Sequence, residues 1–245
     1  MNTIQTLEQM QQLRLQGMFH SYKAQTELPM NQQLEGHELV AHLVQSEKLN
    51  RSNEKAAYYL KLAKLRLHAT LETIECSPAR NLTKQQLAQL AEGRYQQQGE
   101  NVLITGPTGC GKSHLACALG HQACLQGNKT IYLNMNRFAE KITLAKLDGT
   151  YIKLLNHLER QQLFILDDFG IHAMNHEVRL TLLQLLEDRY DKRSIVVTSQ
   201  LPVSKWHDYI QDLTLADAIL DRMTANAHRI ELKGESLRRK KVKLN

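Results

Sequence analysis

One eight-residue segment constrains the fold of this chain more than any other part of its sequence. Residues 106–113 read GPTGCGKS and match the pattern GxxxxGK[ST]. The apolar run at residues 101–104 precedes this segment, and a run with helical spacing at residues 114–127 follows it. A strand, a glycine-rich turn and a helix in this order are the context that the pattern requires. The segment therefore predicts a P-loop fold of the α/β class.

The residue types of this segment are suited to binding a nucleoside triphosphate. Its glycines let successive backbone N–H groups point at phosphate oxygens, and the following helix adds the positive end of its dipole. Lys112 is expected to reach the β- and γ-phosphates of ATP, and the Ser113 hydroxyl to hold Mg²⁺. A glycine-rich turn that binds nothing is the alternative. The predicted nucleotide contacts are Gly106, Pro107, Thr108, Gly109, Cys110, Gly111, Lys112, Ser113 and His114.

Two consecutive carboxylates follow a second apolar run, at residues 163–166. Asp167 would lie at the same sheet edge as the phosphate loop, where it could hold Mg²⁺ through the water shell of the ion. Asp168 is then placed to act as the general base for the attacking water. The usual residue at this place is Glu, so the shorter Asp168 leaves the rate of hydrolysis open. A helix N-cap or a turn is the plain alternative for both carboxylates.

Two further polar residues are candidates for a role in hydrolysis. Gln200 follows the apolar run at residues 195–198 and could sense the γ-phosphate, although polar residues also end many ordinary strands. Arg222 ends a helical segment and could reach the γ-phosphate of a neighbouring subunit. A surface ion pair with a nearby acid is the simpler explanation of this arginine. The catalytic candidates are thus Lys112, Asp168, Gln200 and Arg222.

The spacing of apolar residues changes along the chain. Leucine-rich helical spacing up to about residue 76 predicts a small all-helical domain, and the Ser77-Pro78 pair interrupts it. We therefore predict a helical domain at residues 1–77, for DNA binding and assembly, and an ATPase domain at residues 78–245. In the second part, short apolar runs alternate with helical ones, which predicts a parallel sheet wrapped by helices. A short helix is expected at residues 84–92 and strands at residues 101–104, 130–134, 163–166, 195–198 and 230–232.

Composition and charge narrow the class of protein. No apolar run approaches the roughly 18 residues that a membrane span needs, and the first residues lack the layout of an export signal, so we expect a cytoplasmic protein with no membrane partner. The four cysteines lack CxxC spacing and the histidines lack HExxH spacing, which argues against a zinc site. The net charge is +6. A surplus of this sign suits a polyanionic partner but does not establish one.

The segment between positions 48 and 66 contains six basic residues and a single acidic residue, Glu54. Several of them recur at helical spacing and can form a stripe that follows a phosphate backbone without reading bases. A solvated helix face is the alternative. A second basic cluster lies between residues 233 and 243. The predicted DNA contacts are Lys48, Arg51, Lys55, Lys61, Lys64 and Arg66.

Several motifs together resemble the IstB family of transposition helper ATPases, and the resemblance covers nearly the whole chain. They are GPTGCGKSHLA, FILDDFG, VVTSQLP, KWHDYIQD, LADAILDRM and GESLRRK, with LRLQGM and the spacing of Glu47, Arg51 and Lys55 in the N-terminal part. The resemblance implies an AAA+ core, assembly of a homo-oligomer on duplex DNA with ATP, and cooperation with a partner transposase of the same insertion sequence. It also implies a bacterial protein that joins the nucleoid when bound to DNA.

The same resemblance assigns roles to single residues. Asp167 and Asp168 match the Asp-Asp pair of the family, Gln200 its sensor and Arg222 its finger. The role of Arg238 in GESLRRK stays open, because a compact core of this kind can lack the lid that carries a second sensor. The predicted function is a DNA-binding transposition helper that hydrolyses ATP.

Three alternatives remain. Helicase loaders of the DnaC type share the GKSHLA and DRM features. A nucleotide-bound scaffold with little hydrolysis would use the same loop to recruit the transposase. A small-molecule kinase would need an acceptor-substrate motif, and we find none.

Overall fold

The structure is a computed structural model that describes residues 2–237 of the 245-residue chain. Contacts divide the chain into two compact units, residues 1–58 and residues 59–245. The boundary therefore precedes the one predicted near Ser77. Residues 59–77 group with the second unit because Ala69 lies in its core and Leu65 and Leu71 pack against that core. The assignment of separate functions to residues 1–77 and 78–245 stays a prediction.

The first unit consists of helices. They are α1 (Thr3–Gln12), α2 (Gln16–Thr26), a 3₁₀ turn η1 (Met30–Gln32) and α3 (Gly36–Ala63), which continues into the second unit. Helix α1 begins with a capping box, because Asn2 and Gln5 exchange hydrogen bonds between their side chains and backbone N–H groups. Helical spacing in the sequence therefore predicted this part correctly.

A buried carboxylate joins α2 to α3. Glu47, on α3, is 6% exposed and accepts hydrogen bonds from the N–H groups of Gly17 (2.8 Å) and Met18 (3.2 Å). These N–H groups lie in the first turn of α2, where no partner exists within the helix. Arg51 Nε donates to the same carboxylate at 2.7 Å. A Cβ on Gly17 would lie 2.4 Å from the carbonyl oxygen of Ser46, so the helices approach too closely for a side chain there.

We expect Glu47→Gln to destabilise the first unit by about 2 kcal/mol, because charged hydrogen bonds become neutral ones. The hydrogen bond from Arg51 and those from the two N–H groups hold the pKa of Glu47 below its usual value of 4.5, against the effect of burial. A carboxylate whose pKa falls on folding stabilises the fold above its unfolded pKa, and the contribution disappears as pH falls through the folded pKa. Amide hydrogen exchange at Gly17 and Met18 measures the strength of their hydrogen bonds to Glu47.

The Glu47→Gln variant should lose protection at those two amides at pH 7, whereas the parental protein should lose it only on acidification. Glu54→Gln, at an exposed acid of the same helix, is the control and should leave both amides protected. Equal protection in Glu47→Gln and the parental chain at pH 7 would refute the assigned role.

The second unit is built on a five-stranded, all-parallel sheet in the order β2-β3-β4-β1-β5. Parallel strands with helical connections confirm the predicted α/β class. Four strands lie where the apolar runs predicted them, and the fifth begins three residues earlier than predicted. The strands are β1 (Asn101–Thr105), β2 (Thr130–Asn134), β3 (Leu163–Phe169), β4 (Ser194–Ser199) and β5 (Ala227–Glu231).

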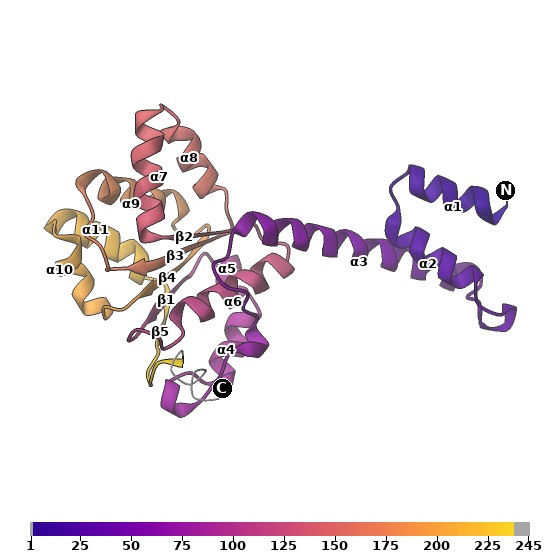
Figure 1. The fold of residues 1–245 in the computed structure, drawn as a ribbon, viewed down its shortest axis with the longest axis horizontal. Helices are drawn as coiled ribbons and strands as arrows, with labels where there is room; N and C mark the ends of the chain where they lie inside the picture. Colours follow the sequence, from indigo (N-terminus) through magenta and orange to yellow (C-terminus); the bar gives the residue numbers. More distant parts are fainter. Residues whose placement is uncertain (1, 238–245) are drawn as a thin grey trace, which may run out of the picture. The chain divides into compact units, whose positions relative to one another are not determined.

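Helices cover both faces of this sheet (Figure 1). Alternate residues of each strand enter opposite cores: Leu103 lies in one, and Val102 and Ile104 lie in the other. The first core is closed by α7 (Met135–Leu147), α8 (Tyr151–Glu159), α9 (His176–Arg189), α10 (Trp206–Ile210) and α11 (Leu213–Thr224). The second is closed by α4 (Lys84–Ala91), α5 (Arg94–Gln97) and α6 (Lys112–Leu125). Short 3₁₀ turns are η2 (Leu71–Thr73), η3 (Pro78–Arg80) and η4 (Val203–Lys205).

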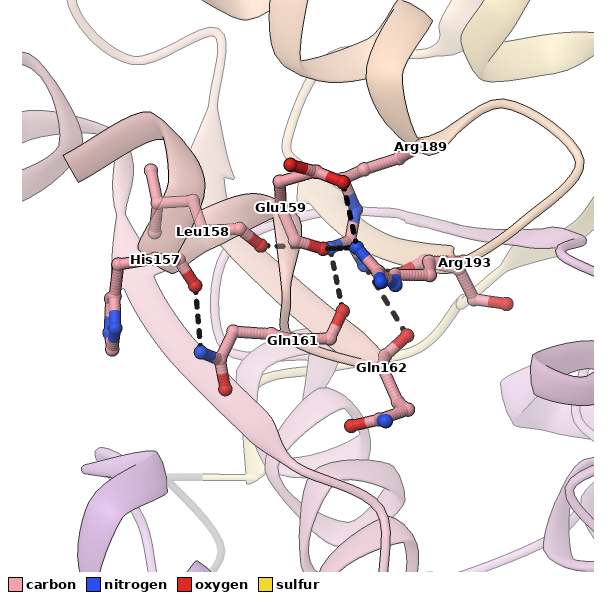
Figure 2. A network of polar contacts seen from close by, with 8 residues as sticks. His157, Leu158, Glu159, Gln161, Gln162, Arg189 and Arg193 are labelled. Carbon is pink, nitrogen blue, oxygen red and sulfur yellow. Dashed lines mark hydrogen bonds and ion pairs between the residues drawn. The ribbon is translucent and has the colours of Figure 1, made fainter. Parts of the chain in front are cut away.

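A buried arginine at the end of α9 fastens the chain where β3 and β4 begin (Figure 2). Arg189 is 1% exposed, and its guanidinium donates five hydrogen bonds to backbone carbonyls. Buried carbonyls at the end of a helix, in a loop or at the start of a strand need a donor. The acceptors are the carbonyl oxygens of Leu158, Glu159, Gln161, Gln162 and Ser194.

The cysteines and the helices were each predicted to lack a special role, in disulfides and in membrane spans. Cys117 and Cys124 are fully buried on α6, as expected for residues that pack two turns apart, and their thiols are free. Across residues 2–237, no helix has the length and apolar character that a membrane crossing demands.

Candidate functional site

The phosphate loop connects the carboxyl end of β1 to the start of α6, as the motif predicts. Gly111 is the N-cap of α6, and it has a φ of +94°, in the region that L side chains avoid. Gly109 has a φ of +85° for the same turn. The N–H groups at the start of α6, which have no acceptor within the helix, therefore belong to the loop, where they favour an anion.

Lys112 lies inside the loop. Its side chain is buried, and Nζ donates to the carbonyl oxygens of Gly106 at 2.8 Å and Pro107 at 2.9 Å. An ammonium group held by neutral carbonyls gains more from the charged oxygens of a phosphate. The structure therefore places a cation where a triphosphate would attract it.

The second predicted element of the site, Asp167, reaches the loop from the carboxyl end of β3. Ser113 Oγ donates to Asp167 Oδ1 at 2.9 Å. The hydroxyl groups of Tyr132 and Thr198 also donate to this carboxylate, which is fully buried. The sheet register thus joins two residues that lie 54 positions apart, both of which the sequence predicted as magnesium ligands.

The donor set fits Mg²⁺ when phosphate oxygens complete it. Ser113 and Asp167 offer a hydroxyl and a carboxylate, which are hard oxygen ligands, and magnesium in nucleotide sites takes few ligands from the protein itself. Among residues 2–237, no group of three or more His, Cys, Asp or Glu side chains is arranged to hold a metal. A metal at this place would therefore depend on the nucleotide for its remaining ligands.

Asp168 lies in a bulge, where the register of β3 against β4 shifts between Leu166 and Phe169. Its φ is +62°, and its N–H donates to Thr198 Oγ1 at 3.1 Å, so the bulge turns its half-buried carboxylate into the cavity. Burial and the neighbouring charge of Asp167 raise the pKa of Asp168, while Arg66 and Lys112 lower it. A carboxylate in this environment is a better proton acceptor than an exposed one.

Gln200 also reaches the loop, because β4 ends beside β1. Thr108 Oγ1 donates to Gln200 Oε1 at 2.7 Å. His114 is the last of the predicted nucleotide contacts, and its Nε2 atom lies 3.1 Å from Thr73 Oγ1. Both side chains border the same cavity as Lys112 and Ser113.

This cavity has a volume of about 820 Å³. Small-molecule and cofactor pockets are roughly 300–1,000 Å³ and combine an apolar wall with a few polar groups. Polar groups of the phosphate loop line one part of the cavity. The remaining wall includes the apolar residues Leu67, Ile74, Leu82, Leu232 and Leu237.

Arg66, which the sequence predicts as a DNA contact, forms ion pairs with both carboxylates of this site. Its Nη1 atom lies 3.3 Å from Asp168 Oδ2 and 3.7 Å from Asp167 Oδ2, and it lines the cavity. The Tyr132 hydroxyl, and after it the two carboxylates, raise the pKa of Arg66 against the effect of burial, so it stays charged there. No local pattern signals a contact between residues 102 positions apart.

The other predicted DNA contacts are exposed. Lys48, Arg51, Lys55 and Lys61 lie on α3, and Lys64 follows the end of that helix with a φ of +50°. Arg51 also forms the ion pair with Glu47 described above. Contact with DNA stays a prediction for all six basic residues, and Arg66 has in addition its ion pairs with Asp167 and Asp168.

Arg222 lies away from the phosphate loop of its own chain. Its backbone carbonyl accepts a hydrogen bond from Asn101 Nδ2 at 3.0 Å, and Asn101 begins β1, whereas the loop follows the end of β1. Its guanidinium contacts Glu187 at 3.1 Å and donates to the carbonyl of Ala218 at 3.1 Å. Arg238, whose role the sequence left open, lies outside the described residues.

Comparisons with known proteins agree with this geometry. A solved structure of the DnaC helicase loader superimposes with a TM-score of 0.58 at 18% identity and covers 70% of this chain and 100% of that chain. The replication initiator DnaA, bound to AMPPCP and single-stranded DNA, gives a TM-score of 0.60 at 20% identity and covers 74% of this chain and 56% of that chain. These two similarities show that the chain shares the fold of those proteins, and nothing finer.

Sequence relatives identify the family. The protein y4pL of Sinorhizobium fredii (strain NBRC 101917 / NGR234), described by its name as an insertion sequence ATP-binding protein, is 42% identical over 234 residues, which are 96% of each chain. A family model, described as IstB-like ATP binding protein, matches residues 8–245. The chain therefore belongs to the family of IstB-like ATP-binding proteins.

Proposed function

We propose that this chain hydrolyses ATP, assembles as an oligomer on duplex DNA and works with a transposase of the same insertion sequence. One observation carries the proposal for hydrolysis: the Ser113–Asp167 hydrogen bond lies beside Lys112 and Asp168 at one cavity. The names of its relatives, which refer to insertion sequences and ATP, support the biological setting.

Binding of ATP would begin with the phosphate groups. The N–H groups at the start of α6 face them, and Lys112 would exchange the carbonyl oxygens of Gly106 and Pro107 for phosphate oxygens. Ser113 and Asp167 would hold Mg²⁺. The ion would supply positive charge that neutralises the β- and γ-phosphate oxygens.

Hydrolysis would then need a positioned water and a proton acceptor. Asp168 is the candidate base, because the bulge presents its carboxylate to the cavity and burial raises its pKa. Arg66 holds that carboxylate at 3.3 Å. Gln200 touches the loop through Thr108 and is the candidate for detecting the γ-phosphate.

We expect Asp168→Asn to bind ATP with an affinity within about threefold of the parental value and to hydrolyse it about 100-fold more slowly, since an amide cannot accept the proton. Binding of a fluorescent ATP analogue and steady-state phosphate release measure the two effects. Asp217→Asn, at an exposed acid on α11, is the matched control and should keep the parental rate. A parental rate in Asp168→Asn would exclude the base assignment.

The same assay tests hydrolysis itself. Phosphate release by the parental protein, with and without duplex DNA, separates an ATPase from a scaffold that only binds nucleotide. Release that stays at background in both conditions would favour the scaffold.

Contact with DNA is proposed for the exposed basic residues of α3 and for Lys64. Lysine and arginine side chains that neutralise phosphates make the affinity fall steeply as salt rises. Replacement of these residues should weaken binding without changing sequence preference, because backbone contacts carry no base information.

Arg222 is proposed to act on the neighbouring subunit, because it lies at the opposite end of β1 from its own loop. Arg222→Ala should bind ATP normally and lose the stimulation of hydrolysis by DNA and by protein concentration, about 10³-fold for a finger in trans. A mixture with Lys112→Ala, which lacks a working loop but keeps Arg222, should recover part of the activity. Unchanged stimulation in Arg222→Ala, or no recovery in the mixture, would contradict action in trans.

A further inference from the structure

The three glycines of the phosphate loop are each approached closely by a different part of the chain. A Cβ on Gly106 would lie 2.2 Å from the carbonyl oxygen of Leu232, and one on Gly109 would lie 2.2 Å from Ser236 Oγ. A Cβ on Gly111 would lie 2.7 Å from Arg80 Nη2. The loop is therefore enclosed by residues that the GxxxxGK[ST] pattern does not include.

Two successive carbonyls of the loop are held by these surrounding residues. Arg80 Nη2 donates to the carbonyl oxygen of Cys110 at 2.6 Å, and the N–H of Leu237 donates to that of Gly109 at 3.1 Å. In a planar trans peptide the C=O and the N–H point in opposite directions. The contact with Cys110 therefore turns the N–H of Gly111 away from the guanidinium. A phosphate loop needs its N–H donors aimed inward at an anion, and Arg80 constrains one of them.

Arg80 is itself rigidly mounted. Arg80 is 9% exposed, and Nη1 donates to the carbonyl of Glu75 at 3.2 Å and lies 3.9 Å from the carboxylate of the same residue, so Glu75 and Cys110 fix the guanidinium. Its own carbonyl accepts from the N–H of Lys233 at 3.1 Å. The next residue, Asn81, has a φ of +55° and donates from Nδ2 to the carbonyl of Glu231 at 2.9 Å. The turn η3 is thus attached to the end of β5, and its arginine spans from there to the loop.

We propose that Arg80 is a positioning residue of the nucleotide site, which holds the Cys110–Gly111 peptide in the orientation that binds phosphate. This inference rests on the proposed binding of ATP. Within residues 2–237, the hydrogen bonds of Arg80 go to backbone carbonyls and not to Lys112, Ser113 or Asp168. Its loss should therefore weaken nucleotide affinity more than it slows the chemical step.

The experiment uses the full-length chain and compares the parental protein with Arg80→Met and Arg80→Lys. Arg94→Met is the matched control, because Arg94 is an arginine with a 76% exposed side chain on the nearby helix α5. Three quantities are measured: the Kd for a fluorescent ATP analogue with Mg²⁺, kcat at saturating ATP, and amide hydrogen exchange of residues 109–113 without nucleotide. The melting temperature reports folding.

Arg80→Met should raise Kd at least about tenfold, which corresponds to about 1.4 kcal/mol. It should leave kcat within about threefold and speed exchange in the loop while helices α7 and α9 stay protected. Arg80→Lys keeps one cationic group but cannot donate in the fork geometry of a guanidinium. Its Kd should therefore lie between those of the parental protein and Arg80→Met. Arg94→Met should match the parental chain in all three.

A folded Arg80→Met with a Kd within twofold of the parental value would overturn the inference. So would a loss confined to kcat, or faster exchange throughout the chain in place of the loop. If Arg80→Met does not fold, Arg80→Lys decides, with a threefold rise in Kd in support and a parental Kd against. A parental chain without magnesium-dependent ATP binding would refute the proposed function together with this inference, whereas parental binding with an unaffected Arg80→Met refutes the inference alone.

Discussion

Lys112→Ala is expected to lower kcat/KM for ATP hydrolysis by at least about 10²–10³-fold. The ammonium group is the one cation held inside the phosphate loop in the described structure, through the carbonyls of Gly106 and Pro107. Without it, the charge on the β- and γ-phosphates would be balanced by backbone dipoles and the metal alone. Binding of a fluorescent ATP analogue and phosphate release measure the loss.

Lys129→Ala is the control for this experiment, because Lys129 is an exposed lysine just before β2. It should bind and hydrolyse ATP as the parental chain does. Parental affinity in Lys112→Ala would place the triphosphate elsewhere and would remove the basis of the proposed function.

Arg189→Met is expected to produce the largest loss of stability. The substitution leaves the carbonyls of Leu158, Gln161 and Ser194, among others, buried without their donor. Each unsatisfied buried group costs about 1–3 kcal/mol, so the total should reach at least about 3 kcal/mol after relaxation. For a unit of this size, that corresponds to a fall in melting temperature of roughly 10 °C.

Thermal unfolding followed by circular dichroism checks this prediction. Arg160→Met is the matched control, because Arg160 is exposed at the end of α8 and lies near the same loop. Its melting temperature should stay within about 2 °C of the parental value, since surface substitutions usually change little. A similar small change in Arg189→Met would show that water replaces the guanidinium, and it would refute the assigned role.

The strands of the sheet show how far a sequence pattern reaches. The four runs that form β1 to β4 are apolar because both faces of these strands are covered, and they were predicted at the right places. Strand β5 was predicted at residues 230–232 and lies at Ala227–Glu231. Among the strands within residues 2–237 it pairs only with β1, at the sheet edge, and His228 and Arg229 are exposed there. A polar edge strand lacks the apolar run that marks its neighbours.

The candidate site residues also differ in how far the sequence could predict their positions. The order of residues in the phosphate loop and the Asp167-Asp168 pair are local patterns, and the structure places Asp168 at the cavity of the loop and Asp167 within a hydrogen bond of Ser113. Their chemical roles remain to be tested by the substitutions above. Arg66 was assigned to a basic stripe, because its charge and spacing resemble those of the lysines before it, but the chain leaves helical geometry after Ala63 and turns it towards Asp168.

The sequence alone determined the class of fold, the phosphate loop and the acidic strand end, because each depends on residues that are neighbours in the chain. Only the tertiary structure showed that Arg66 and Arg80 line the cavity beside the phosphate loop and that Arg222 lies at the other end of β1. These contacts depend on sheet register and on the ends of elements far apart in the sequence. Short-range periodicity carries no information about such distances.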